Sequence, residues 1–204
     1  MHRYEVLASR RVFDGRVLAV RSDQVAMPGD AVSQRDVVEL PGAVGIVALD
    51  ADERVLLVRQ YRHPVGRHLW EIPAGLLDST TESALEAGQR ELAEEGFVTA
   101  GRWDCLCDIL TSPGMTDETI RLLLARDLAD VPVGERHVAF HEEADMEVTR
   151  VPLVDAVARV LSGEIENGIT VAGLLAAFAS LRGGLALRAV DAEWAARKGG
   201  QSSG

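Results

Sequence analysis

The sequence predicts an α/β domain that is preceded by an antiparallel β arm. Short runs of alternating apolar and polar residues fill positions 4–40, whereas strand-like runs alternate with helical spacing further along the chain. We therefore expect an N-terminal β arm over residues 1–40, a main domain over residues 41–182, and a C-terminal helix with a flexible tail over residues 183–204.

Three strands are predicted in the arm, over Tyr4–Leu7, Arg16–Ala26 and Val32–Leu40, with turn signals at Asp14-Gly15 and Pro28-Gly29-Asp30. Such an arm has too little apolar surface to be stable alone, so it should pack on the main domain or on a second copy of the chain. Arg35 in the third strand is either a solvated arginine or a substrate contact.

The main domain should contain four core strands followed by helices. The apolar runs AVGIVALD and RVLLVRQY predict two strands, and two more follow after residue 100. Helical spacing recurs towards the C-terminus, where Trp194 would anchor the last helix. The expected ranges are Ala43–Asp50, Arg54–Tyr61, Trp103–Leu110 and Thr119–Asp127 for the strands, and Val151–Leu161, Ile169–Leu181 and Leu185–Arg197 for the helices.

Composition excludes some classes of protein. The net charge of −11 argues against a protein that holds nucleic acid by its phosphates, and an anionic substrate would need a metal or local arginines. Cys105 and Cys107 alternate within a strand, so we expect reduced thiols on one face of the sheet. The N-terminus has no apolar signal region, and the apolar run 169–181 is shorter than the ~20 residues of a membrane span, so we expect a cytoplasmic protein without membrane contact.

An acidic helix carries the candidate chemistry. Glu91 and Glu95 are four residues apart, so they project from one face of a helix, and Glu94 lies within the same turn. This turn is at the negative end of the helix dipole, where acids repel one another and a cation would stabilise them. The pattern is therefore either a solvated acidic face or a cation site.

The boundaries of this helix are predicted from local signals. Ser79-Thr80-Thr81-Glu82 has the form of a capping box, which would start the helix near Thr80. Gly96 would end it, because glycine adopts the left-handed conformation after a helix without steric cost. Ahead of the helix, Pro73 and Gly75 impose a turn and allow close approach of the backbone.

Together these residues resemble the Nudix box of the Nudix hydrolases, whose pattern is G-x5-E-x7-R-E-U-x-E-E-x-G-U, with U a bulky apolar residue. The segment from Glu82 to Glu95 fits without a gap. The first spacer has six residues instead of five, and Gly96-Phe97 replaces the x-G of the pattern, which affects the expected metal geometry.

Two further segments resemble the ADP-ribose pyrophosphatase branch of this family. A proline beyond the box marks that branch, and Pro113-Gly114 stands at that place; with Met115 it would contact substrate, although a Pro-Gly turn is also an ordinary loop. The segment HEEAD resembles the loop that carries the catalytic base in this branch. Glu142 matches that base best, and Glu143 is the reserve; an exposed acidic loop is the alternative.

The resemblance implies a Nudix α/β/α sandwich with a mixed sheet, and a β arm that is exchanged between the subunits of a homodimer. The implied reaction is metal-dependent hydrolysis of ADP-ribose to AMP and ribose 5-phosphate, with Mg²⁺ or Mn²⁺ because all ligands are oxygens. The implied ligands are Glu91, Glu94, Glu95 and the carbonyl of Ala74.

The resemblance also assigns supporting roles. Arg62 and Glu71 would position the substrate, although Arg62 could instead form a surface salt bridge, and Gly75, Glu82 and Arg90 would hold the loop and helix together. Two other functions remain open: a Nudix pyrophosphatase for another nucleoside diphosphate sugar, and a Nudix-fold nucleotide-binding module without turnover.

Overall fold

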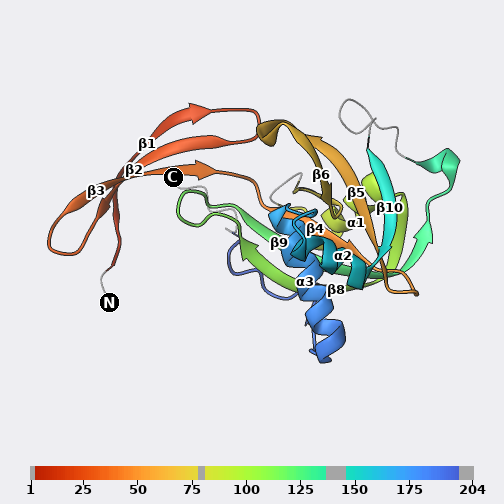
Figure 1. Cartoon of the computed structure of the whole chain (residues 1–204). Helices are drawn as coiled ribbons and strands as arrows, with labels where there is room; N and C mark the ends of the chain where they lie inside the picture. Colours follow the sequence, from red (N-terminus) through yellow and green to blue (C-terminus); the bar gives the residue numbers. More distant parts are fainter. Residues whose placement is uncertain (1–2, 78–80, 137–145, 198–204) are drawn as a thin grey trace.

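The computed structural model of the protein describes residues 3–77, 81–136 and 146–197. Over these residues the strands form three sheets (Figure 1). The arm sheet has the order β1-β2-β3, with β1 (Val6–Asp14), β2 (Ala19–Ala26) and β3 (Val32–Glu39). The second sheet has the order β10-β5-β6, with β5 (Arg54–Arg62), β6 (Arg67–Glu71) and β10 (Glu147–Pro152).

The third sheet has five strands and is mixed. Its order is β11-β8-β9-β4-β7, with β4 (Ala43–Ala48), β7 (Ala74–Leu76), β8 (Val98–Leu110), β9 (Thr119–Asp130) and β11 (Arg188–Ala189). β4 pairs parallel to β9, and the other pairs are antiparallel. The helices are α1 (Ala84–Gly96), α2 (Leu153–Leu161) and α3 (Gly168–Gly183), and the short 3-10 turns are η1 (His63–Val65) and η2 (Val133–Glu135).

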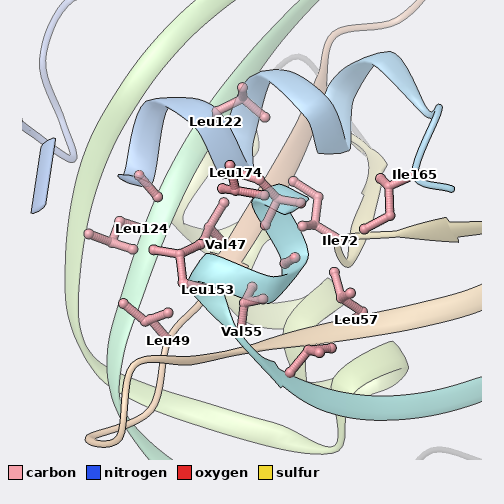
Figure 2. Packing of buried hydrophobic residues seen from close by; sticks show 14 of the residues in the cluster. Val47, Leu49, Val55, Leu57, Ile72, Leu122, Leu124, Leu153, Ile165 and Leu174 are labelled. Carbon is pink, nitrogen blue, oxygen red and sulfur yellow. The ribbon is translucent and has the colours of Figure 1, made fainter. Parts of the chain in front are cut away.

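Two hydrophobic cores lie on opposite faces of the sheets. Alternate residues of β4 enter different cores: Val44 and Ile46 pack with α1, whereas Val47 packs with α2 and α3. β5 divides in the same way, with Leu56 in the first core and Leu57 in the second. Figure 2 shows the second core, with Val47 and Leu57. Strands buried on both faces have continuous apolar runs, which explains the sequences AVGIVALD and RVLLVRQY. The predicted α/β sandwich with a mixed sheet is confirmed.

The antiparallel arm is also confirmed, and it projects away from the main domain (Figure 1). Its first strand is longer than predicted and is exposed along its whole length. The arm is joined to the domain at its base, where the amide of Val38 donates to the carbonyl of Met115 at 2.8 Å and the amide of Leu40 donates to Asp117 Oδ1 at 3.1 Å. Arg21 adds ion pairs with Glu39 and Asp117 at the same place.

The start of α1 differs from the prediction. The helix begins at Ala84 and is capped by Ser83, whose side chain accepts from the amide of Glu86 while Glu86 accepts from the amide of Ser83. The S/T-x-x-E pattern occurs twice in succession, and the second copy forms the capping box. The predicted start near Thr80 is wrong; Ser79 and Thr80 themselves lie outside the described residues.

The end of α1 also differs in its conformation. Gly96 is the last helical residue, and Phe97 adopts the left-handed conformation, with φ 54°. A Cβ atom on Gly96 would lie 3.2 Å from Leu92 Cδ1 and 3.4 Å from Leu56 Cδ1. Glycine at this position therefore allows the end of α1 to pack closely against these leucines. Phe97 is held by the amide of Val131, which donates to its carbonyl at 2.9 Å.

The helix predicted over Leu185–Arg197 is wrong. The structure places β11 and a series of turns in this segment. Trp194 is nevertheless an anchor, as predicted, because it is 9% exposed and its indole N–H donates to Thr119 Oγ1 at 2.9 Å. Side-chain and backbone contacts therefore hold this segment against the sheet, and it does not form a helix.

Two smaller predictions concern the cysteines and the membrane. Cys105 and Cys107 are free thiols, as expected. A bulge between them breaks the strict alternation of β8, so Leu106 and Cys107 both contact the core that contains α2 and α3.

In the described part of the chain, no helix is long and apolar enough to span a membrane.

Candidate active site

An ion pair between a partly exposed arginine of β5 and a buried glutamate of β6 forms one wall of the candidate site. Arg62 Nε donates to Glu71 Oε1 at 2.9 Å, and Arg62 Nη2 donates to Oε2 at 2.6 Å. Glu71 is 1% exposed, and Gln60 Nε2 approaches its Oε2 at 3.5 Å. The planar guanidinium fork and the carboxylate match in geometry, so the pair fixes both side chains. Arg62 thus orients Glu71, and the depth of Glu71 leaves little of it to touch a substrate.

The glycine of the box brings the short strand β7 against α1. A Cβ atom at Gly75 would lie 1.9 Å from Glu91 Oε1 and 2.1 Å from Glu91 Cδ, so the carboxylate of Glu91 occupies the space that any other residue would fill. The neighbouring amide of Ala74 donates to Glu95 Oε2 at 3.0 Å. Glu91 and Glu95 are each 9% exposed. Two carboxylates of one helix face are therefore buried against the backbone of β7.

Arg90 connects the loop before α1 to the helix. It donates to Glu82 Oε1 at 3.2 Å, to the carbonyl of Leu76 at 3.1 Å, and to Glu91 Oε1 at 2.6 Å. Burial by itself lowers the pKa of Arg90, but hydrogen bonds and charge interactions with Glu82 and Glu91 outweigh it, so the pKa is raised. Arg90 therefore stays charged and fixes one oxygen of Glu91.

Glu95 is the most perturbed acid of the site. The pKa of Glu95 is raised to about 8. Burial is the largest cause, and the charges of Glu91 and Glu71 act in the same direction. The hydrogen bond from Ala74 and the charge of Arg62 act in the opposite direction. A carboxyl group in this surrounding carries its charge only at a cost, which a nearby cation would remove.

The donor set suits a hard divalent cation. Glu91 and Glu95 supply only oxygen atoms, and burial, together with the charges of Glu91 and Glu71, raises the pKa of Glu95, so the charged form of Glu95 is disfavoured at this place. In the described ranges, no group of three or more His, Cys, Asp or Glu side chains is arranged to hold a metal ion. The oxygens of Glu91 and Glu71 are instead engaged by Arg90 and Arg62.

Glu94 does not join the buried pair. The sequence predicts that three acids converge on one turn, but the side chain of Glu94 is 37% exposed and lies 3.6 Å from Arg90 Nη1. The side chain of Glu94 thus lies at the surface beside Arg90, and its role as a metal ligand stays a prediction.

Other predicted site residues lie apart from this pair. Arg35 is on the exposed arm, where it donates to Ser33 and to the carbonyl of Gln34. The turn Pro113–Met115 meets the base of the arm, through the carbonyl of Met115. Glu142 and Glu143 lie outside the described residues, so their role as base stays a prediction.

Sequence reasoning missed two buried polar residues near the site. Gln60 stands two residues before Arg62 on β5, so strand alternation already placed both on one face towards Glu71. Thr170 in α3 is fully buried, and its Oγ1 accepts from the amide of Ile72 at 2.9 Å. No local signal predicts the contact of Thr170, because the two residues are 98 positions apart.

Comparison with known proteins identifies the family of the chain. Residues 39–166 match the model of the NUDIX domain. The chain is 45% identical to an ADP-ribose pyrophosphatase of Mycobacterium tuberculosis, over 95% of this chain and 92% of that protein. It is 34% identical to an ADP-ribose pyrophosphatase of Bacillus subtilis, over 81% of this chain and 88% of that protein.

A solved structure shares the fold. The crystal structure of an ADP compounds hydrolase superposes with a TM-score of 0.77 at 21% identity, covering 90% of this chain and 97% of the other.

The environment of Glu95 predicts how stability depends on pH in metal-free protein. The pKa of Glu95 is about 8 in the folded state, above its value in the unfolded chain, so the folded state binds the proton more tightly. The resulting stabilisation is complete below about pH 4 and is lost as the pH rises through about 8. In the presence of a chelator, the Tm of the unmodified protein should fall between pH 5 and 8. In Glu95→Gln this fall should be smaller by several degrees.

Glu94→Gln is the matched control, because Glu94 is on the same turn but more exposed. It should keep the pH dependence of the unmodified protein. If the Tm of the unmodified protein and that of Glu95→Gln depend on pH to the same extent, the pKa of Glu95 is not raised in the folded protein.

Proposed function

We propose that this chain, which belongs to the NUDIX family, hydrolyses the pyrophosphate of ADP-ribose. The products would be AMP and ribose 5-phosphate. The substrate follows from the two bacterial ADP-ribose pyrophosphatases, because the similarity to each extends over most of both chains. The observation that carries the proposal is the buried pair Glu91 and Glu95, held against the backbone of Ala74 and Gly75.

These residues would hold Mg²⁺ or Mn²⁺. Glu91 and Glu95 are the proposed principal ligands, and Glu94 and the carbonyl of Ala74 would complete the set. Such an ion neutralises the phosphate oxygens and makes a bound water more acidic. The chain itself keeps Glu91 and Glu95 in place through Gly75 and Arg90.

The other side chains would bind the substrate and move the proton. The Arg62–Glu71 pair forms a rigid wall at the ends of β5 and β6, where Arg62 is 41% exposed and presents positive charge to an anionic substrate. This matters in a chain with a net charge of −11, which would otherwise repel a pyrophosphate. Glu142, with Glu143 as the alternative, would take the proton of the attacking water.

A product assay tests the proposal. The protein is incubated with ADP-ribose, GDP-mannose and other nucleoside diphosphate sugars, each with Mg²⁺ or Mn²⁺, and the products are identified by mass spectrometry. AMP and ribose 5-phosphate from ADP-ribose, at the highest kcat/KM of the panel, are expected. A higher kcat/KM for another sugar nucleotide would move the assignment to that substrate, and binding without any product would identify a binding module.

Gly75→Ala should weaken the metal site with little loss of stability. The added methyl group would displace the carboxylate of Glu91, whose Oε1 lies 1.9 Å from the position of that Cβ. We expect the Mn²⁺ concentration for half-maximal rate to rise about tenfold or more, since loss of a charged ligand contact costs at least ~1.5 kcal/mol. Gly168→Ala is the control, because no atom lies within 4 Å of the Cβ added there. An unchanged Mn²⁺ requirement in Gly75→Ala would contradict the assignment of Glu91.

The base is tested by kinetics on Glu142→Gln and Glu143→Gln. A general base contributes about 10²–10⁴-fold to the rate, so Glu142→Gln should lose roughly that factor in kcat with KM nearly unchanged. Glu143→Gln should lose far less. A larger loss in Glu143→Gln would assign the base to Glu143, and small losses in both would place it among the glutamates of α1.

We also propose that two chains form a homodimer through the arm. The arm exposes several large apolar side chains, which a second copy would cover; they are Tyr4, Val6, Leu7, Val12, Phe13, Val17, Leu18 and Val32. Their positions on a sheet that projects from the domain fit an exchange of arms between subunits (Figure 1).

Val12→Asp tests the homodimer by placing a charge on this surface. Val12 is 51% exposed in one chain, and burying a carboxylate against a partner would weaken association. Light scattering should show a dimer for the unmodified protein and a larger monomer fraction for Val12→Asp. Val133→Asp is the control, since Val133 is 79% exposed and lies outside the arm. A monomeric unmodified protein at micromolar concentration would refute the dimer.

A further inference from the structure

The C-terminal segment from Arg188 to Arg197, which we call the C-terminal strap, crosses the five-stranded sheet and ends at the loop before α1. At one end, β11 pairs with Cys105 and Asp104 of β8. At the other end, Arg197 Nη2 donates to the carbonyl of Glu82 at 2.8 Å. The three strap residues that make these contacts, Arg188, Ala189 and Arg197, are close in sequence, but they connect β8 with the loop before α1.

A buried arginine holds the strap to the sheet. The side chain of Arg121 is 3% exposed, and it donates to Asp108 at 2.7 and 3.1 Å. The same guanidinium donates to three strap carbonyls, at 3.4, 2.7 and 3.0 Å; they belong to Val190, Ala192 and Glu193. A buried guanidinium that lost these acceptors would be left with unpaired donors, so the strap is fixed in one path.

Trp194 extends this attachment towards the site. The centre of its ring lies 5.0 Å from the guanidinium carbon of Arg121 and 5.9 Å from that of Arg197. Trp194 packs in the same core as α1 and Leu77, next to Gly42. The amide of Leu77 in turn donates to the carbonyl of Gly42 at 2.9 Å. The strap therefore contacts the loop before α1 at Glu82, and Trp194 lies in the same core as Leu77 at the start of that loop.

Glu82 links Arg197 to a proposed metal ligand. Arg197 binds the backbone of Glu82, and the side chain of Glu82 accepts from Arg90 at 3.2 and 3.4 Å. Arg90 then donates to Glu91 Oε1 at 2.6 Å. Three consecutive contacts thus connect the strap to Glu91, and each of them is polar and directional.

We propose that Arg197 is a positioning residue of the active site: it fixes Glu82, so that Arg90 holds Glu91 in the geometry that binds the metal. This inference rests on the proposed function, because it assigns Arg197 a role in the metal site formed by Glu91 and Glu95. Arg197 itself does not contact the reacting groups in this arrangement, and its effect is transmitted through Glu82 and Arg90.

Mn²⁺ binding without substrate tests the role of Arg197. Titration followed by electron paramagnetic resonance should show a dissociation constant about three- to tenfold higher in Arg197→Ala, the range expected for one lost hydrogen bond. Arg197→Lys keeps a donor at this place and should recover part of the affinity. Arg182→Ala is the control, because Arg182 pairs with Glu53 at the surface and should leave Mn²⁺ binding unchanged.

Two further measurements separate positioning from a general loss of stability. Hydrogen exchange of metal-free Arg197→Ala should be faster over residues 81–90, while Tm falls by no more than a few degrees. In a double-mutant cycle, Arg197→Ala should have much less effect on Mn²⁺ binding when Arg90 is already alanine, because the connection is then broken.

The outcomes distinguish the inference from the proposed function. An unmodified protein that binds Mn²⁺ and hydrolyses ADP-ribose, with unchanged Mn²⁺ binding in Arg197→Ala, would overturn the inference alone. Additive effects of Arg197→Ala and Arg90→Ala would overturn it as well. An unmodified protein that neither binds Mn²⁺ nor hydrolyses ADP-ribose would overturn both.

Discussion

The hydrogen bonds of Arg90 are the interaction on which the geometry of the active site depends. One guanidinium binds the carboxylate of Glu82, the carbonyl of Leu76 and an oxygen of Glu91. These groups come from β7, from the loop before α1 and from α1 itself, so a single side chain ties the three segments together. The carboxylate of Glu91 that Arg90 holds is the same group that lies against Gly75. Removing one partner from a partly buried charge network is costly, because the remaining charges lose their compensation.

The distribution of charge favours a cation at this place. Glu71 and Glu91 each accept hydrogen bonds from an arginine, whereas the hydrogen bond described for Glu95 comes from a neutral backbone amide. Glu95 is therefore the acid on which burial and neighbouring negative charge act most strongly, and its pKa rises to about 8. In a chain with a net charge of −11, a divalent ion at this place would both stabilise Glu95 and allow an anionic substrate to approach.

Local sequence patterns predicted the parts of the fold that local physics determines. The continuous apolar runs of β4 and β5 predicted core strands, because strands buried on both faces need apolar residues at every position. The start of α1 was mispredicted, since two S/T-x-x-E patterns follow one another in the sequence and the helix begins at the second. The helix predicted over Leu185–Arg197 does not form, because Arg121 binds backbone carbonyls of this segment from about 70 positions away. The Glu91 and Glu95 pair followed from helical spacing, but the contact of Arg197 with Glu82 has no local signal.

The exchanged Gly96-Phe97 shows how the helix exit can depart from a family pattern without moving the acids. Gly96 is the last helical residue, and a side chain there would meet Leu56 and Leu92, both fully buried, so this position favours glycine. The left-handed position then falls on Phe97, at a steric cost of roughly 1–2 kcal/mol for a residue with a Cβ atom. Arg136 compensates in part, since its guanidinium carbon lies 5.0 Å from the Phe97 ring. The strain is confined to the residue after the helix, so Glu91 and Glu95 keep their regular helical positions against β7.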